Sequence, residues 1–189
     1  GRRVSVEADT TGGAVAAAFA RDGLVAVPVR RNGDQLAPLR DRIVAEGGQC
    51  VPVGADARNE AEMIALFDRV EAEIGAVEVL VFNIGANSPM PILDETVRRY
   101  TKIWEMCALA GFITAREAAR RMAPRGRGTI IFTGATASLR GSAGFAGFSG
   151  GKFALRSLAQ AMARELGPRG IHVAHSIIDG AIDTDFIAS

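Results

Sequence analysis

Apolar residues recur with two spacings along this chain, and the two spacings alternate. Short apolar runs are typical of strands buried on both faces, whereas apolar positions three and four residues apart indicate one face of a helix. Strands are predicted at residues 24–29, 50–53, 77–82, 128–133 and 171–177. Helices are predicted at residues 14–21, 34–46, 60–74, 94–123 and 147–166. The pattern therefore alternates β and α along the chain.

Repeated β-α-β units with right-handed crossovers define a parallel sheet that is covered by helices on both faces. We therefore expect a doubly wound α/β fold of the Rossmann type, with three layers in the order α/β/α. A single domain over residues 1–189 is long enough for a substantial core. No internal repeat, linker or low-complexity segment divides the sequence.

Composition and charge argue against several classes of function. The formal net charge of +1 gives no electrostatic basis for binding nucleic acid or an anionic membrane. We find no run of about 18 apolar residues that could span a bilayer, and no signal peptide. Cys50 and Cys107 make neither a disulfide framework nor a metal site, and His172 and His175 are interpreted as sheet residues. We expect a cytoplasmic protein that acts on a small molecule.

The segment Phe148-Ser149-Gly150-Gly151-Lys152 opens a predicted helix that follows an apolar strand. It resembles the active-site segment of the short-chain dehydrogenase/reductase family, whose signature is Tyr-x-x-x-Lys. The resemblance covers nearly the whole chain and implies a nicotinamide-dependent oxidoreductase. It implies that Lys152 bonds the nicotinamide ribose and lowers the pKa of a neighbouring hydroxyl. Phe148 stands where the family has the tyrosine that exchanges a proton with the substrate oxygen.

Two more positions of the family's catalytic set lack their polar groups here. The family's serine aligns near Ala135, and its asparagine aligns with Ala108. Ser138 is the candidate replacement for that serine; alternatively, its hydroxyl satisfies backbone groups at the turn. The only tyrosine, Tyr100, lies well away in the sequence, so no adjacent residue obviously replaces the missing phenol.

The phosphate-binding loop that the resemblance implies is only partly present. Glycines at the first strand–helix turn let the backbone approach a pyrophosphate at the helix N-terminus. The last glycine of that motif falls on Gly12, whereas an earlier one falls on Val6, which cannot comfortably take positive φ. An ordinary turn without a bound anion is the alternative. Arg30 and Arg31 end a strand where NADP-preferring members carry a basic residue, so we expect NADP, with NAD as the second choice.

Other cofactor positions agree better with the family pattern. Asp56 matches the aspartate that contacts the adenine amino group. Asn83 and Gly85 match the Asn-Ala-Gly segment after the fourth strand, where the glycine allows close approach to the ribose. Thr184 matches the threonine of the Pro-Gly-x-x-x-Thr loop on the cofactor's carboxamide or pyrophosphate side. For each residue an ordinary loop or capping role is the alternative.

Two functional classes stay open. The first is an atypical oxidoreductase that uses water, a substrate group or Ser138 in place of the tyrosine. The second is a catalytically inactive member that serves as a cofactor-binding or protein-interaction scaffold. The resemblance also implies a homodimer or homotetramer, because family members pair the helices that correspond to residues 105–123 and 153–166. The chain ends before the family's substrate-covering region and seventh strand, so the substrate is not defined.

Overall fold

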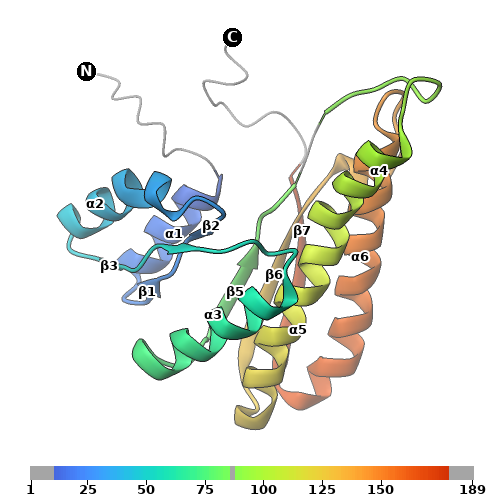
Figure 1. The fold of residues 1–189 in the computed structure, drawn as a ribbon. Coiled ribbons are helices and arrows are strands. Elements are labelled where there is room, and N and C mark those ends of the chain that lie inside the picture. Colours follow the sequence, from blue (N-terminus) through green and yellow to red (C-terminus); the bar gives the residue numbers. More distant parts are fainter. Residues whose placement is uncertain (1–10, 86–87, 179–189) are drawn as a thin grey trace. The chain divides into compact units, whose positions relative to one another are not determined.

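A computed structural model describes residues 11–85 and 88–178 of the chain. They form two compact units that divide after Asp56. Each unit is built from parallel strands joined by helices (Figure 1). The α/β class with parallel strands, expected from the alternating pattern, is therefore confirmed. The expectation of a single domain over residues 1–189 stays a prediction.

In the first unit, short strands alternate with helices. Its elements are α1 (Thr11–Arg21), β1 (Val25–Ala26), β2 (Val29–Arg30), the 3-10 turn η1 (Gly33–Leu36), α2 (Ala37–Ala45), β3 (Gln49–Cys50) and β4 (Val53–Gly54). β1 pairs with β3, and β2 pairs with β4. Each predicted strand is split in two because Pro28 lacks the N–H that the ladder between them uses. A small core consists of Ala17, Ala20, Ala26, Leu39 and Ile43.

The second unit contains a parallel sheet in the order β5-β6-β7. Its strands are β5 (Val79–Phe82), β6 (Gly128–Ala135) and β7 (Ile171–Ile178). Its helices are α3 (Glu60–Glu73), α4 (Val97–Trp104), α5 (Ala110–Met122) and α6 (Ala146–Leu166). A π-helical turn, η2 (Glu105–Leu109), joins α4 to α5, and 3-10 turns form η3 (Ala123–Arg125), η4 (Thr136–Ser138) and η5 (Gly167–Arg169). None of the helices in the described part of the chain could cross a membrane, because none is both long and apolar enough.

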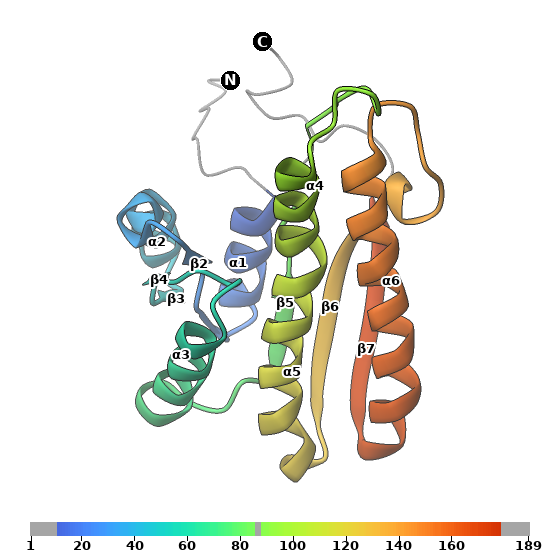
Figure 2. The same ribbon diagram turned by 45° about the vertical axis from the view of Figure 1, so that its right-hand side comes forward.

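The core of the second unit lies between the sheet and the two helices α5 and α6, which are side by side on one face of it (Figures 1 and 2). Phe82 and Phe132 are register partners on neighbouring strands, and their rings meet edge to face with centroids 6.3 Å apart. Burying one such side chain contributes roughly 2–3 kcal/mol. A Cβ at Gly111 of α5 would lie 2.5 Å from Leu155 Cδ1, so α5 and α6 pack closely above these rings.

Three glycines of α6 let this helix approach α4 and η2. A Cβ at Gly151 would lie 2.7 Å from Cys107 Cβ, and one at Gly150 would lie 2.9 Å from the Tyr100 hydroxyl oxygen. At Gly147 the nearest atom would be 3.2 Å away, on Ile103. We call this contact the glycine seam. Because α6 has no side chains at these three positions, the side chains of α4 and η2 lie directly against its backbone, and the seam thereby fixes where the first turns of α6 are held.

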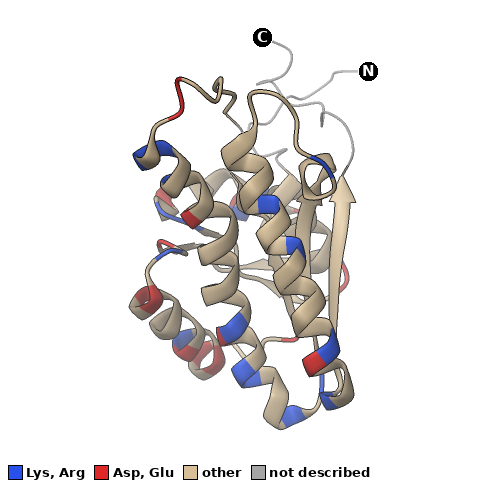
Figure 3. Ribbon diagram, turned by 90° about the vertical axis from the view of Figure 1, so that its right-hand side faces the viewer, with Lys and Arg blue, Asp and Glu red and all other residues tan. Residues whose placement is uncertain are grey.

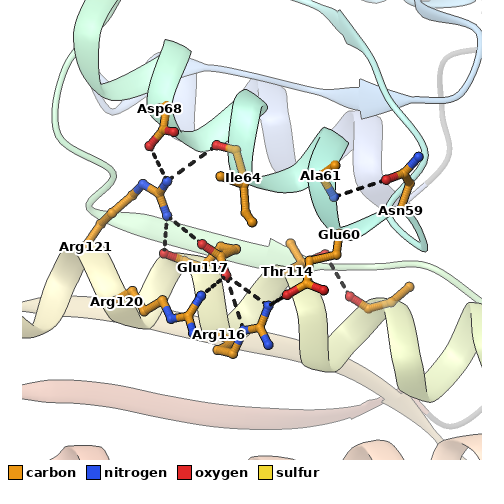
Figure 4. Close-up of polar contacts among 11 residues, drawn as sticks. Asn59, Glu60, Ala61, Ile64, Asp68, Thr114, Arg116, Glu117, Arg120 and Arg121 are labelled. Carbon is orange, nitrogen blue, oxygen red and sulfur yellow. Dashed lines mark hydrogen bonds and ion pairs between the residues drawn. The ribbon is translucent and has the colours of Figure 1, made fainter.

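A buried carboxylate on α5 connects this helix to α3. The Glu117 side chain is 3% exposed, and its carboxylate accepts hydrogen bonds from three arginines, Arg116, Arg120 and Arg121 (Figure 4). Two of these guanidinium groups also pair with carboxylates of α3, Glu60 and Asp68. Burial by itself would raise the pKa of Glu117, but the hydrogen bonds and charges of the three arginines outweigh it and lower this pKa below its usual value. Glu117 is therefore the charged centre of the contact between α3 and α5.

Replacing Glu117 by alanine should lower the free energy of unfolding by about 3 kcal/mol, because the arginines lose their shared buried partner. The matched control is Glu73→Ala, which removes one carboxylate from an exposed pair with Arg69 and should cost no more than about 0.5 kcal/mol. Urea unfolding followed by circular dichroism measures both values. Equal costs for the two variants would contradict the structural role of Glu117.

Candidate functional site

Two side chains from successive turns of α6 lie at the carboxyl ends of β5 and β6. Lys152 is 5% exposed, and its Nζ donates a hydrogen bond of 2.8 Å to the carbonyl oxygen of Thr133, near the end of β6. It makes a longer hydrogen bond of 3.5 Å to the carbonyl oxygen of Ile84, just after β5. The ring of Phe148, one turn earlier, has its centroid 5.7 Å from Nζ. The signature segment therefore places its lysine where the two strands end.

The loop after β5 passes close to this pair of side chains. A Cβ at Gly85 would lie 3.4 Å from Lys152 Nζ and 3.7 Å from Phe148 Cε2. A side chain here would therefore fill the space next to the ammonium group. Asn83, two residues earlier, directly follows β5 and is half-buried. The structure thus brings together four predicted residues of the second unit, Lys152, Phe148, Gly85 and Asn83, around one strand end.

The Lys152 ammonium group is held by neutral dipoles. Burial lowers the pKa of Lys152, and the charge of Cys107 in η2 acts in the opposite direction. In residues 11–85 and 88–178, no carboxylate forms an ion pair with it. Its electrostatic support comes from two carbonyl oxygens and the face of an aromatic ring, a weaker compensation than an ion pair. This explains why burial dominates the pKa of the group.

Ser138 lies in the turn that follows β6, and its side chain is fully buried. Its Oγ accepts a hydrogen bond of 3.2 Å from the backbone N–H of Ala135, and its carbonyl oxygen accepts a longer one from Arg156. These contacts fasten the end of β6, the structural role that was one of the two alternatives. A catalytic role for Ser138 stays a prediction. Ala108, at the position of the family's asparagine, is buried in the π-helical turn η2.

The remaining predicted cofactor residues belong to the first unit or lie outside the described residues. Gly12 is in the first turn of α1. Arg30 ends β2 and is exposed, as is Arg31 after it. Because the Ala55 N–H donates a hydrogen bond of 3.0 Å to the Arg30 carbonyl oxygen, the half-buried Asp56 follows at the same sheet edge. Thr184 lies outside the described residues. Their roles toward a cofactor stay predictions.

His175 is a feature of the site region that the sequence pattern did not identify. It lies in β7 in register with Phe132, and its imidazole covers Gly134, where a Cβ would overlap the ring. Its Nε2 is buried and has no hydrogen-bond partner in the described part of the chain. Burial lowers the pKa of His175, and the charges of Lys152 and Arg156 lower it further. A hydrogen bond to its own backbone raises this pKa but does not outweigh them. The neutral imidazole is thus the form that the folded protein favours.

Groups that could hold a metal ion are not part of this site. Within the described residues, no three His, Cys, Asp or Glu side chains lie together in such an arrangement. The chemistry of the described site therefore resides in one buried ammonium group, backbone carbonyls and an aromatic ring.

Comparison with known proteins agrees with the resemblance of the signature segment. A sequence model described as short chain dehydrogenase matches residues 7–189, so the chain belongs to the short-chain dehydrogenase family. It is 30% identical over 132 residues to a 3alpha-hydroxysteroid dehydrogenase of Mediterraneibacter gnavus, which covers 70% of this chain and 52% of that enzyme. It is 34% identical over 148 residues to an L-rhamnose 1-dehydrogenase (NAD(P)(+)) of Azotobacter vinelandii, which covers 78% of this chain and 57% of that enzyme. The alignments thus span just over half the length of these two relatives.

Solved structures share the fold. A short-chain dehydrogenase from Rhodopseudomonas palustris is 50% identical, with a TM-score of 0.88 over 93% of this chain and 82% of that one. A gluconate 5-dehydrogenase from Burkholderia cenocepacia, in complex with NADP and tartrate, is 25% identical, with a TM-score of 0.85 over 93% of this chain and 69% of that one. The predicted Rossmann-type α/β fold is therefore the one that this family has.

Stability should fall as pH falls below about 6.5, the ordinary pKa of histidine, because protonating His175 is disfavoured in the folded protein. The contribution of the neutral His175 imidazole to the free energy of unfolding is complete above pH 6.5 and is lost as pH falls through the lowered pKa of His175 in the folded state. His175→Gln should reduce the difference in free energy of unfolding between pH 7.5 and pH 5.5, measured with urea. The control His172→Gln changes an exposed residue on the same strand and should leave that difference as in the wild type. An unaltered difference in His175→Gln would contradict the assignment.

Proposed function

We propose that this chain is an atypical NAD(P)-dependent oxidoreductase that interconverts a carbonyl compound and an alcohol without the family's tyrosine. The observation that carries the proposal is the position of Lys152 beside Phe148 and Gly85 at the ends of β5 and β6. The two relatives described above act, by their names, on a hydroxysteroid and on a sugar, so both support a hydroxyl or carbonyl group as the reacting centre.

The residues present fit a nicotinamide dinucleotide at this position. Gly85 carries no side chain where one would fill the space beside Lys152, which lets a ligand oxygen approach the ammonium group. The ammonium group has three N–H donors, and two of them have acceptors among the described residues, so within that part of the chain the third can bond a ligand oxygen. When bound, the reduced nicotinamide supplies the hydride. The third N–H of Lys152 then faces the bound ligands, and Gly85 permits their close approach.

We propose NADP rather than NAD as the preferred cofactor. Arg30 and Arg31 are exposed at the end of β2, next to the end of β4, where a 2′-phosphate could accept charge-assisted hydrogen bonds. The complex of gluconate 5-dehydrogenase with NADP supports this choice within the family.

We also propose a homodimer or homotetramer that pairs the helices α4, α5 and α6. Their outward-facing aromatic side chains are between 40% and 43% exposed: Tyr100, Trp104, Phe112 and Phe153. Residues 106–115 and 157–163 of these helices carry no charge (Figure 3). A second copy of the chain would remove this apolar surface from water.

Fluorescence titration with NADPH, followed by NADPH oxidation with a panel of ketones and aldehydes, tests the oxidoreductase assignment. Binding together with slow, carbonyl-dependent oxidation is the expected result. Binding without turnover of any carbonyl would favour the non-catalytic alternative, and absence of binding would exclude both.

Arg31→Ala should lower the preference for NADPH over NADH by about tenfold, because it removes a cationic donor to the 2′-phosphate. The two dissociation constants are measured by fluorescence for the wild type and the variant. Arg40→Ala, which changes an exposed arginine of α2 that pairs with Asp41, is the control and should leave the ratio unchanged. Equal affinities of the wild type for NADPH and NADH would contradict the proposed preference.

Phe148→Tyr should increase the rate of carbonyl reduction, because it places a phenol beside the Lys152 ammonium group, whose charge favours the phenolate and lowers the tyrosine pKa. General acids contribute about 10²–10⁴-fold, and the gain should be smaller, since Ala108 and Ala135 still lack the family's polar groups. Phe153→Tyr, on the exposed side of the same helix, is the control without an expected gain. A fast wild type that the tyrosine slows or leaves unchanged would show that the chemistry does not use position 148.

A further inference from the structure

We propose that Lys152 itself transfers the proton to and from the substrate oxygen, the task that a tyrosine performs elsewhere in the family. This inference rests on the proposed oxidoreductase function and adds the identity of its acid–base group. It follows from the contacts of Lys152, from the charges around it and from the positions of the other hydroxyl groups.

Among residues 11–85 and 88–178, the contacts of Lys152 leave one N–H donor for a substrate. Nζ carries three protons when charged, and the carbonyl oxygens of Thr133 and Ile84 accept two of them. The ring of Phe148 has its centroid 5.7 Å from Nζ, and Gly85 has no side chain to fill the space beside the ammonium group. A carbonyl oxygen that reached the space between Phe148 and Gly85 would meet the third N–H directly or through one water molecule.

The surroundings of Lys152 favour loss of its proton. Burial lowers the pKa of Lys152, opposed by the charge of Cys107 from η2. Two other titratable groups nearby are bases, His175 from β7 and Arg156 from α6 itself. The charges of Lys152 and Arg156 lower the pKa of His175, which favours its neutral imidazole. An ammonium group without a carboxylate partner in the described residues is a better acid than an exposed lysine, and the neutral amine is accordingly accessible as a base.

The other hydroxyl groups of this region are placed less suitably. Tyr100, the only tyrosine of the chain, packs against Gly147 and Gly150 on the α4 side of α6, in the glycine seam. The Ser138 hydroxyl is fully buried and accepts its hydrogen bond from Ala135. Phe148 has no proton to donate. Lys152 is the only residue of the signature segment whose side chain ordinarily titrates.

The reaction balances with a nicotinamide dinucleotide as hydride donor. During reduction, the carbonyl carbon accepts a hydride with its electron pair, and the π electrons of the C=O bond move to oxygen. The oxygen takes a proton from the Lys152 ammonium group, so that one N–H bond breaks and one O–H bond forms. The products are an alcohol, a neutral amine and the oxidised nicotinamide, and water returns a proton to the amine. In alcohol oxidation the neutral amine removes the hydroxyl proton.

The composition of the chain makes a direct test possible, because Lys102 and Lys152 are its only lysines. Lys102 is exposed on α4 and serves as an internal control. With [13Cε]lysine incorporated, two NMR signals report the two amines, and Lys102→Arg assigns them. We expect the Lys152 signal of the cofactor-free protein to titrate at lower pH than the Lys102 signal. Titration of both signals at the same pH, or of Lys152 at the higher one, would overturn the proposal.

Lys152→Arg separates proton transfer from cofactor binding, because arginine keeps the charge but does not deprotonate in proteins. We expect NADPH affinity to stay within about tenfold of the wild type and carbonyl reduction to fall about 10²-fold or more. In the wild type, reduction should decline with rising pH through the pKa measured by NMR, while alcohol oxidation should rise through it. Tyr100→Phe should keep both the rate and this pH profile.

The outcomes distinguish the two proposals. A wild type that does not bind NADPH or reduce any carbonyl contradicts the oxidoreductase function itself. Turnover that survives Lys152→Arg, or a pH profile that does not follow the Lys152 signal, overturns the proton-transfer role alone. Circular dichroism and thermal unfolding establish that the variant is folded, and Lys152→Gln replaces it if the arginine does not fit. A loss of turnover in Tyr100→Phe would assign the proton to the phenol instead.

Discussion

The close packing of α6 against α4 and η2, at positions where α6 has glycines and no side chains, is the constraint on which the candidate site depends. Gly147, Gly150 and Gly151 allow backbone to meet side chain across the glycine seam, and the seam holds the first turns of α6 against both neighbours. Phe148 and Lys152 belong to those turns but point to the strand ends instead. A methyl group at Gly151 would have to displace Cys107, so a change on one side of the helix would move the ammonium group on the other.

The protein deals with buried charge in two different ways. Glu117 is surrounded by three guanidinium groups, and although burial alone raises a carboxyl pKa, these partners lower it, so the group stays ionised. Lys152 has carbonyl dipoles and a ring, and burial lowers its pKa, so the group is less firmly charged. The first arrangement suits a structural contact between α3 and α5. The second suits a group that has to change its protonation state.

The elements could be predicted from the sequence because their apolar periods are regular and because the signature segment has a fixed spacing. The predicted helix over residues 94–123 corresponds to α4, η2 and α5, but its π-helical turn is not visible in a period of three or four residues. The splitting of the first strands at Pro28 could have been predicted, since proline removes a ladder donor. The spacing of Phe148 and Lys152 predicted one turn of helix, which the structure confirms.

The environment of the site could not be predicted in the same way, because it depends on contacts between distant segments. His175 became visible as a buried base only through its neighbour Gly134 on β6, and the Glu117 contact depends on which face of α3 meets α5.

The glycine seam has a kinetic consequence of its own. Cys107 is fully buried there, so a thiol reagent can reach its sulfur only while the helices are transiently apart. The rate at which Cys107 is modified therefore reports how often α6 separates from η2 by local opening of the folded protein.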